Sequence, residues 1–421
     1  MQVIIKIVGS KVTEKSSVDL PRLGLVVPSL ADGGGVPAVA RFIKDAVLDS
    51  GRYQLKLISL ATASGDADSF CLLKPKTWHR GTVVSEGVWD GLPFVHVGAV
   101  CGEFEFQRYM ARDVLARVTA DCDVLQVVCG TPAWANAVCG LGKSVAVQCA
   151  TRARVERRLR DLQPKGMGDW WRKAMTEITD RMDDRALRRV DAIQVENPWM
   201  LEYAKAINGV RRVDLRYAPP GVDTEAFQPL PQRPLAIDPY ILCVARLSDP
   251  RKNIGLLLEA YAKLPLTVID CVRLVLAGSS GPPDVFWQRA DQLGLRERIT
   301  YIPRPEREEL ISLYQRASVF ALPSDEEGLG VVLLEAMACA VPVVATRCGG
   351  PDGIISNGKD GYLVDLDDAQ SMSDCLQRLL LDDFLNQKMG IEARLTVENR
   401  YSKTVAGAAF LSMWDRLLTE R

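Results

Sequence analysis

The chain has 421 residues, of which 48% are hydrophobic and 25% charged, and its net charge is −1. Such a length and composition fit a globular protein of two ordinary domains. A charge so close to zero excludes a global electrostatic field that would favour nucleic acid. The eleven cysteines are irregularly spaced and include no Cys-x-x-Cys pair, which favours unpaired thiols over a disulfide or metal framework.

Membrane-targeting signals are not found in the sequence. No apolar run is long enough to span a bilayer, and the first residues, MQVIIKIVGSK, lack a cationic start followed by a long apolar core. We therefore expect a cytoplasmic protein that is at most peripheral to the inner face of a membrane.

Short apolar segments rich in β-branched residues recur along the first half of the chain. Residues 23–30 predict a buried strand, and a helical pattern follows the glycines near residue 34. The alternation of strands and helices predicts a mostly parallel sheet with helices on both faces. Further strands are expected at 53–62, 94–100, 123–130 and 144–151.

A proline-rich segment, 217–240, is the best candidate for a linker, and strand–helix alternation restarts after it. We therefore divide the chain into a first domain of residues 1–217 plus 402–421 and a second of residues 218–401. Two such α/β units predict a cleft between them, with ligands at the carboxyl ends of the strands. In the second unit, strands are expected at 240–247, 272–279, 297–303, 317–324, 341–347 and 361–366.

The stretch 321–350 carries the strongest functional signal. A strand and an acidic loop lead to Gly328, Leu329 and Gly330, and a helix starts directly afterwards. Glycines before a helix leave its first N–H groups bare, and these groups together with the helix dipole form an anion site. A diphosphate would fit there.

Two glutamates flank this loop. Glu327 precedes the glycines, and Glu335 lies on the helix among apolar residues, where a carboxylate needs a specific partner such as a pair of sugar hydroxyls. The alternative interpretation makes Glu327 a solvated loop acid and places Glu335 on the exposed stripe of a surface helix.

The same stretch resembles the signature of glycosyltransferase family 4, whose members share the GT-B fold and retain the configuration of the sugar. The resemblance implies that Glu327 contacts hydroxyls of the transferred sugar, that Glu335 holds the nucleotide ribose, and that the loop amides face sugar and phosphate. It also implies two Rossmann-like domains facing across a cleft, with the last helix crossing back to the first domain. The matching residues are Pro323, Ser324, Glu327, Gly328, Gly330, Glu335, Ala336, Met337, Pro342, Val343, Val344, Ala345, Thr346, Gly349 and Gly350.

A second match to the family covers residues 244–261. Arg246, Arg251 and Lys252 follow the end of a predicted strand, where cations can neutralise a leaving diphosphate; a solvated basic turn is the ordinary alternative. The family has an arginine and a lysine here, both on the diphosphate. One extra residue leaves Arg251 or Lys252 for the lysine position, and the Asn253 that follows favours Lys252.

Three glycines end the first strand–helix connection, and Pro37 suits the first turn of the helix after them. By resemblance, Gly34 and Gly35 touch the donor from the opposite wall of the cleft; a plain turn is the alternative. The loop also fits the dinucleotide fingerprint of a nicotinamide-dependent oxidoreductase. The next strand lacks the terminal acid that would hold a ribose, which counts against that reading.

Residues 151–191 hold many arginines together with Trp170 and Trp171. Such a segment suits an anionic membrane surface or a phosphate-bearing acceptor. The ordinary alternative is a salt-bridged helical pair near the cleft, with both tryptophans packed inside.

Three departures from the family pattern stand out. The histidine usual after the strand at 144–151 is missing, and Gln148, Cys149 or Ala150 takes its place. Gly353 stands where a glutamate is usual. Ala340 occupies a common glycine position, a mild change unless the backbone there is left-handed.

We expect a retaining transferase that moves a hexosyl-type sugar from a nucleotide-diphosphate sugar to an acceptor hydroxyl, in glycan, polysaccharide or glycolipid synthesis. A UDP-sugar is favoured and a GDP-sugar allowed; the acceptor is unassigned. No cofactor, metal or nucleic-acid partner is expected. The alternatives are a GT-B sugar-nucleotide epimerase and a non-catalytic donor-binding protein. Expected catalytic residues are Arg246, Lys252 and Glu327, and expected donor-binding residues are Gly34, Gly35, Gly328, Leu329, Gly330 and Glu335.

Overall fold

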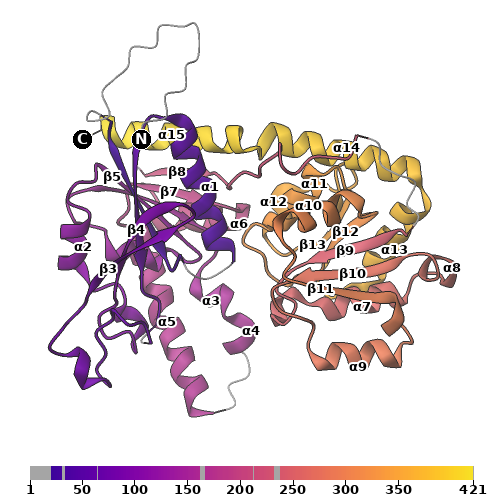
Figure 1. The fold of residues 1–421 in the computed structure, drawn as a ribbon, viewed down its shortest axis with the longest axis horizontal. Helices are drawn as coiled ribbons and strands as arrows, with labels where there is room; N and C mark the ends of the chain where they lie inside the picture. The colour runs from indigo at the N-terminus through magenta and orange to yellow at the C-terminus, as the bar shows by residue number, and fades with distance from the viewer. Residues whose placement is uncertain are drawn as a thin grey trace, which may run out of the picture.

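The computed structural model describes residues 20–30, 34–63, 65–161, 166–211, 213–231 and 238–420. It contains two separate β-sheets, each covered by helices and lying side by side in the molecule (Figure 1). Within the described part of the chain, no helix is long and apolar enough to cross a membrane.

The first sheet has eight strands in the order β3-β4-β2-β1-β5-β6-β7-β8. All neighbours pair in parallel except β3, which is antiparallel to β4. Its strands are β1 (Arg22–Pro28), β2 (Gln54–Leu60), β3 (Val84–Trp89), β4 (Leu92–Val97), β5 (Val124–Cys129), β6 (Ser144–Cys149), β7 (Ala192–Val195) and β8 (Asp214–Tyr217).

The second sheet has six parallel strands in the order β11-β10-β9-β12-β13-β14. Every strand expected in this half is present. They are β9 (Tyr240–Val244), β10 (Arg273–Gly278), β11 (Ile299–Pro303), β12 (Val319–Leu322), β13 (Val343–Thr346) and β14 (Tyr362–Val364).

Both sheets are buried on both faces, because successive residues of a strand point to opposite sides. In β1, Val26 packs into one core while Leu25 and Val27 pack into another, and Leu242 and Cys243 of β9 divide in the same way. The covering helices of the first half are α1 (Gly35–Ser50), α2 (Arg112–Val118), α3 (Ala153–Glu156), α4 (Arg158–Asp161), α5 (Met167–Leu187) and α6 (Pro198–Asn208). Those of the second half are α7 (Ile254–Ala262), α8 (Leu266–Ile269), α9 (Asp284–Gln292), α10 (Arg307–Arg316), α11 (Val331–Ala338), α12 (Gly350–Ile354) and α13 (Ala369–Leu381).

The chain ends in two helices, α14 (Asp383–Arg400) and α15 (Lys403–Thr419), which run back along the molecule to the first sheet (Figure 1). On α15, Phe410 meets Phe42 of α1 edge to face at 5.5 Å, and the fully buried Trp414 meets Tyr53 at 5.6 Å. The Trp414 indole N–H also donates to Gln126 Oε1 of β5 at 2.8 Å. The predicted return of the last helix is therefore confirmed.

Each sheet lies wholly on one side of the connection between β8 and β9. For this reason we propose the same division into domains that the sequence predicts. The strands β3, β7 and β8 were not predicted. The first alternates exposed and half-buried residues at the edge of its sheet, and the other two have only four residues each.

Candidate active site

The loop between β12 and α11 carries three of the predicted donor-binding residues. Gly330 caps α11 with φ +87°, a left-handed conformation that glycine adopts without strain. The Leu329 side chain is buried, and the backbone of Leu329 lies so close to Gly350 that a Cβ on that glycine would clash with it. The loop is thus held at the N-terminus of α11, as the sequence predicts.

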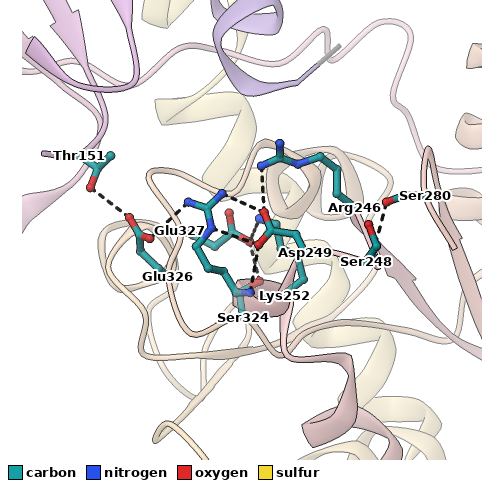
Figure 2. Close-up of polar contacts among 10 residues, drawn as sticks. Thr151, Arg246, Ser248, Asp249, Lys252, Ser280, Ser324, Glu326 and Glu327 are labelled. Carbon is teal, nitrogen blue, oxygen red and sulfur yellow. Dashed lines mark hydrogen bonds and ion pairs between the residues drawn. The ribbon is translucent and has the colours of Figure 1, made fainter. Parts of the chain in front are cut away.

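Lys252 and Glu327, predicted from separate segments, meet directly beside this loop. Lys252 Nζ lies 2.7 Å from Glu327 Oε1, and the Ser324 hydroxyl donates to the same oxygen at 2.6 Å (Figure 2). The backbone of Glu327 is fixed as well, because its N–H donates to Cys348 O at 3.0 Å and its carbonyl accepts from Gly350 N at 2.9 Å. Both side chains are largely buried.

The two arginines of the basic segment gather on Asp249. Arg246 lies 3.2 Å from the Asp249 carboxylate, and Arg251 donates to both of its oxygens, at 3.2 and 2.9 Å (Figure 2). Burial alone would raise the pKa of Asp249, but the hydrogen bonds from Arg251 outweigh it and hold that pKa below its usual value. Arg251 also lies 3.4 Å from Glu326. Every cation predicted here therefore has a carboxylate partner.

The two candidates for the family's lysine position are separated by these contacts. Lys252 reaches Glu327 beside the glycine loop, whereas Arg251 turns toward Asp249 and Glu326. Proximity to Glu327 favours Lys252, the choice made from the sequence.

The first domain closes over the loop from the other side. Asn197, the residue that caps α6, donates from Nδ2 to Ala150 O at 2.6 Å and to Gly328 O at 2.7 Å. Thr151 donates to Glu326 Oε1 at 3.1 Å (Figure 2). A Cβ on Gly328 would lie 2.6 Å from the Ala150 side chain, so only glycine allows this approach.

A cavity of about 620 Å³ opens where the two domains meet, next to the Arg251–Asp249 pair. Residues of both domains line this space, since its walls come from α3, α5 and the connection between β4 and α2 on one side and from the loop after β9 on the other. The lining residues are Glu105, Glu156, Arg157, Arg172, Asp249, Pro250 and Arg251.

Glu335 lies on α11, and its Oε2 accepts a hydrogen bond from the Tyr314 hydroxyl at 2.7 Å. It is half-buried, not on an exposed stripe, and burial raises its pKa to about 7. Among the described residues, Oε1 has no hydrogen-bond partner. The ribose contact that the resemblance implies stays a prediction.

Gly34 and Gly35 start α1 after the carboxyl end of β1. Among the described residues, a Cβ on either glycine would meet nothing within 4 Å. The space beside both is thus open, although no contact joins them to the Lys252–Glu327 pair.

Two departures from the family pattern gain a physical account. A Cβ on Gly353 would lie 2.8 Å from both Pro198 and the Tyr217 hydroxyl, so a glutamate would not fit between the domains there. Ala340 has φ +56°, and the change from glycine is therefore a strained one, not the mild one expected for ordinary backbone.

Glu196 and Gln148 are site residues that the sequence did not single out as a pair. Glu196 follows β7 and is 5% exposed, and its Oε1 accepts a hydrogen bond from Gln148 on β6. Burial raises the pKa of Glu196 to about 7. The one signal available in the sequence was an acid directly after the short, mostly apolar run of residues 192–195.

Two acidic motifs lie away from this site. Residues 121–123 read Asp-Cys-Asp just before β5, and Asp121 and Asp123 both hold Arg22 on β1, which indicates a structural role. Asp66, Asp68 and His96 form the one cluster in the described ranges with ligand atoms close enough for a metal ion, and their polar atoms bond to one another and to nearby serines.

The tryptophans of the arginine-rich segment are at the surface. Trp170 and Trp171 on α5 are 61% and 50% exposed, and Trp171 touches Phe104 with one edge, at 5.9 Å between ring centroids. The expectation that both rings pack inside is therefore wrong.

Comparison with known proteins finds a family match in the second half. Residues 232–396 match the family model of glycosyl transferases group 1. The D-inositol 3-phosphate glycosyltransferase of Corynebacterium urealyticum is 37% identical over 185 residues, which are 39% of this chain and 42% of that protein. The GDP-mannose-dependent alpha-(1-6)-phosphatidylinositol monomannoside mannosyltransferase of Mycolicibacterium smegmatis is 36% identical over 196 residues, which are 43% of this chain and 50% of that protein. The chain thus spans half or less of the length of these relatives.

Solved structures resemble the whole chain in fold. Sucrose-phosphate synthase from Thermosynechococcus elongatus superposes with a TM-score of 0.72 at 20% identity, covering 95% of this chain and all of that one. Anabaena Alr3699/HepE, solved with UDP-glucose, superposes with a TM-score of 0.65 at 14% identity. The superposition covers 94% of this chain and 99% of that one. The fold is GT-B, which confirms the predicted architecture.

Stability should fall as the pH rises from 5 to 8. Burial raises the pKa of Asp183, Glu196 and Glu335 to about 7, so the folded protein binds more protons than the unfolded chain between about pH 4 and 7. The stabilisation is complete below the unfolded pKa values and is lost as pH rises through about 7. Urea unfolding across this range measures the fall in the free energy of unfolding. The fall is up to about 1.4 kcal/mol per pH unit for each extra proton that the folded protein binds.

The substitution Glu335→Gln removes one titrating group and should flatten this dependence. Glu202→Gln, at a side chain that is 70% exposed, serves as the control and should leave the slope unchanged. A wild-type stability that is level or rises between pH 5 and 8 would contradict the prediction.

Proposed function

We propose that this protein, which has the GT-B fold and a glycosyl transferases group 1 segment at residues 232–396, transfers a sugar from a nucleotide-diphosphate sugar to an acceptor hydroxyl. One observation carries the proposal. Lys252 and Glu327 come from different segments and meet 2.7 Å apart beside the bare N-terminus of α11, against the wall of the other domain.

The diphosphate would lie at the amides of Gly328, Leu329 and Gly330, because that helix start favours an anion. Lys252 and Arg246 would then exchange their carboxylate partners for phosphate oxygens. Lys252 pairs with Glu327 and Arg246 pairs with Asp249, so both cations are already positioned by carboxylates and little reorganisation would be needed when the donor binds.

We further propose that transfer retains the configuration of the sugar. The leaving diphosphate departs on the face that the acceptor hydroxyl attacks, and a leaving phosphate oxygen takes the acceptor proton. Lys252 and Arg246 stabilise the negative charge that develops on the diphosphate as the glycosidic bond to it breaks. No protein base is needed for this step, and the cations supply the charge neutralisation that a metal would otherwise provide.

For the donor, a UDP-sugar is favoured and a GDP-sugar is allowed. The Anabaena structure contains UDP-glucose, and the Mycolicibacterium smegmatis relative is named for its use of GDP-mannose. The acceptor would enter from the first domain through the 620 Å³ cavity, whose walls alternate arginines with acids. A hydroxyl-rich molecule of glycan, polysaccharide or glycolipid synthesis suits such a lining.

Nucleotide binding should raise the melting temperature, since a ligand that binds only the folded state stabilises it. In a thermal-shift screen with UDP, GDP, ADP and TDP, we expect one nucleotide, UDP, to raise the melting temperature clearly more than the others. If none of the four shifts the melting temperature at millimolar concentration, the proposed donor class is wrong. NAD serves as the control, and a shift with NAD alone would instead favour an oxidoreductase.

Lys252→Ala should lower turnover by about 10²–10³-fold while changing donor affinity much less, because the interaction strengthens as charge develops on the leaving group. Steady-state release of nucleoside diphosphate and equilibrium donor binding measure the two effects. Arg251→Ala is the matched control, since Arg251 contacts Asp249 and Glu326 and not Glu327. Equal losses of turnover and affinity for Lys252→Ala, or a larger turnover loss for Arg251→Ala, would contradict the assignment.

The products separate the remaining alternatives. A transferase releases nucleoside diphosphate and a glycosylated acceptor. A sugar-nucleotide epimerase of this fold would convert one sugar nucleotide to another without an acceptor, and a binding protein would retain the donor unchanged.

We also propose peripheral contact with anionic membranes through the start of α5. Met167, Trp170 and Trp171 are exposed there, and Arg172 and Lys173 follow at once. Lys173 lies 5.5 Å from the Trp170 ring centre, so an amphipathic ring and a cation share one surface.

Vesicles that contain phosphatidylglycerol should therefore sediment the protein at low salt and release it at high salt, because the basic residues are screened. The double change Trp170→Ala and Trp171→Ala should weaken binding several-fold. Phe384→Ala, at a similarly exposed aromatic residue of the second domain, should have no effect. Absence of binding at low salt would reject the membrane contact.

A further inference from the structure

Glu196 occupies an unusual place for a buried acid. It is the first residue after β7, at the carboxyl edge of the first sheet, and the next residue, Asn197, bridges to Gly328 O of the second domain. Its side chain is therefore fixed where the two domains meet.

The free oxygen of Glu196 faces the glycine loop. A Cβ built on Gly328 would lie 3.6 Å from Glu196 Oε2, with the Ala150 side chain on the same side. A ligand held at the amides of this loop would thus find a small apolar group and one carboxyl oxygen on the opposite wall.

The polar groups around Glu196 are incompletely bonded. Gln148 Nε2 donates to Glu196 Oε1, but within the described ranges neither Glu196 Oε2 nor the buried Gln148 Oε1 has a partner. Gln194 pairs in register with Gln148 on the same face of the sheet, and both of its amide atoms are also buried and unpartnered. Buried polar groups normally have partners, since leaving one unbonded costs about 1–3 kcal/mol. A hydroxyl group of a molecule bound at the glycine loop would satisfy Glu196 Oε2, the one of these atoms that lies near that loop.

We propose that Glu196 Oε2 binds a hydroxyl of the transferred sugar, and that Gln148 is a positioning residue that holds Glu196 for this contact. The proposal rests on the proposed function, since it requires a sugar nucleotide at the Gly328–Gly330 loop.

The chemistry of the two ends of the donor decides which end Glu196 meets. A carboxylate beside the diphosphate would be repelled, whereas a hydroxyl can donate to a carboxylate or accept from a carboxylic acid. With its pKa raised to about 7 by burial, Glu196 has both forms near neutral pH, and both can bind a hydroxyl.

The test compares a nucleotide with the corresponding sugar nucleotide. Calorimetric titration of the full chain with UDP, UDP-glucose, GDP and GDP-mannose gives the four dissociation constants. Glu196→Ala should weaken binding of the sugar nucleotide about tenfold or more and leave that of the nucleoside diphosphate within about twofold. Glu196→Gln keeps one oxygen for Gln148 and an amide for the sugar, so it should restore most of the affinity.

Two further variants separate a sugar contact from a general effect on the fold. Gln148→Leu should weaken sugar-nucleotide binding less than Glu196→Ala does, because it frees Glu196 without removing it. Gln194→Met, on β7 two residues before Glu196, should change no dissociation constant.

Each outcome of these titrations either supports or overturns the proposed sugar contact. The proposal is overturned if Glu196→Ala binds the sugar nucleotide as tightly as wild type, or if it weakens binding of the nucleotide and of the sugar nucleotide equally. Should wild type bind none of the four ligands, the proposed function itself fails and this inference fails with it. If Glu196→Ala does not fold, Glu196→Met, which fills a similar volume without a hydrogen-bonding oxygen, takes its place and should show the same selective loss.

Discussion

The close approach of the Gly328 backbone to the first domain is the constraint on which the site depends. Asn197 Nδ2 donates to both Ala150 O and Gly328 O. Asn197 Oδ1 accepts from the backbone N–H of Met200 and so caps α6. A side chain at residue 328 would clash with Ala150. Because the loop also caps α11 and packs against Gly350, this single arrangement aligns a helix N-terminus with the wall of the opposite domain.

Charge compensation governs how the charged side chains of the site are arranged. Two cations at the site share Asp249, a third pairs with Glu327, and Glu326 ties one of them to Thr151 of the first domain. The Lys252–Glu327 pair is largely buried, and removing one partner of a buried pair leaves an uncompensated charge that costs several kcal/mol, so these two side chains stay in place until another anion replaces the acid. The same pairing explains why the cluster can be both stable and ready for a diphosphate.

The buried acids Glu335 and Glu196 lie on opposite sides of the glycine loop. Glu335 belongs to α11 and is held by the Tyr314 hydroxyl, and Glu196 belongs to the end of β7 and is held by Gln148. Each has one oxygen engaged by the protein and one without a partner among the described residues. Burial is the largest influence on the pKa of each carboxyl and raises it to about 7, so the site combines polar contacts for hydroxyls with less negative charge against an incoming anion.

The amino-acid sequence by itself determined the two parallel sheets, the glycine cap of α11 and the residues that cluster beside it, because strand runs and helix starts are local patterns. Tertiary structure decided what depends on residues far apart in the chain. The Asn197–Gly328 bond spans 131 positions and the Gln148–Glu196 bond spans 48, and neither has a local signal. Tertiary structure also decided that Lys252 and not Arg251 reaches Glu327. It places Gly353 so close to Pro198 that no side chain fits there, and it leaves Trp170 and Trp171 exposed. Which side chains meet, and which meet nothing, follows from packing of the two domains against each other, and no pattern within one segment encodes it.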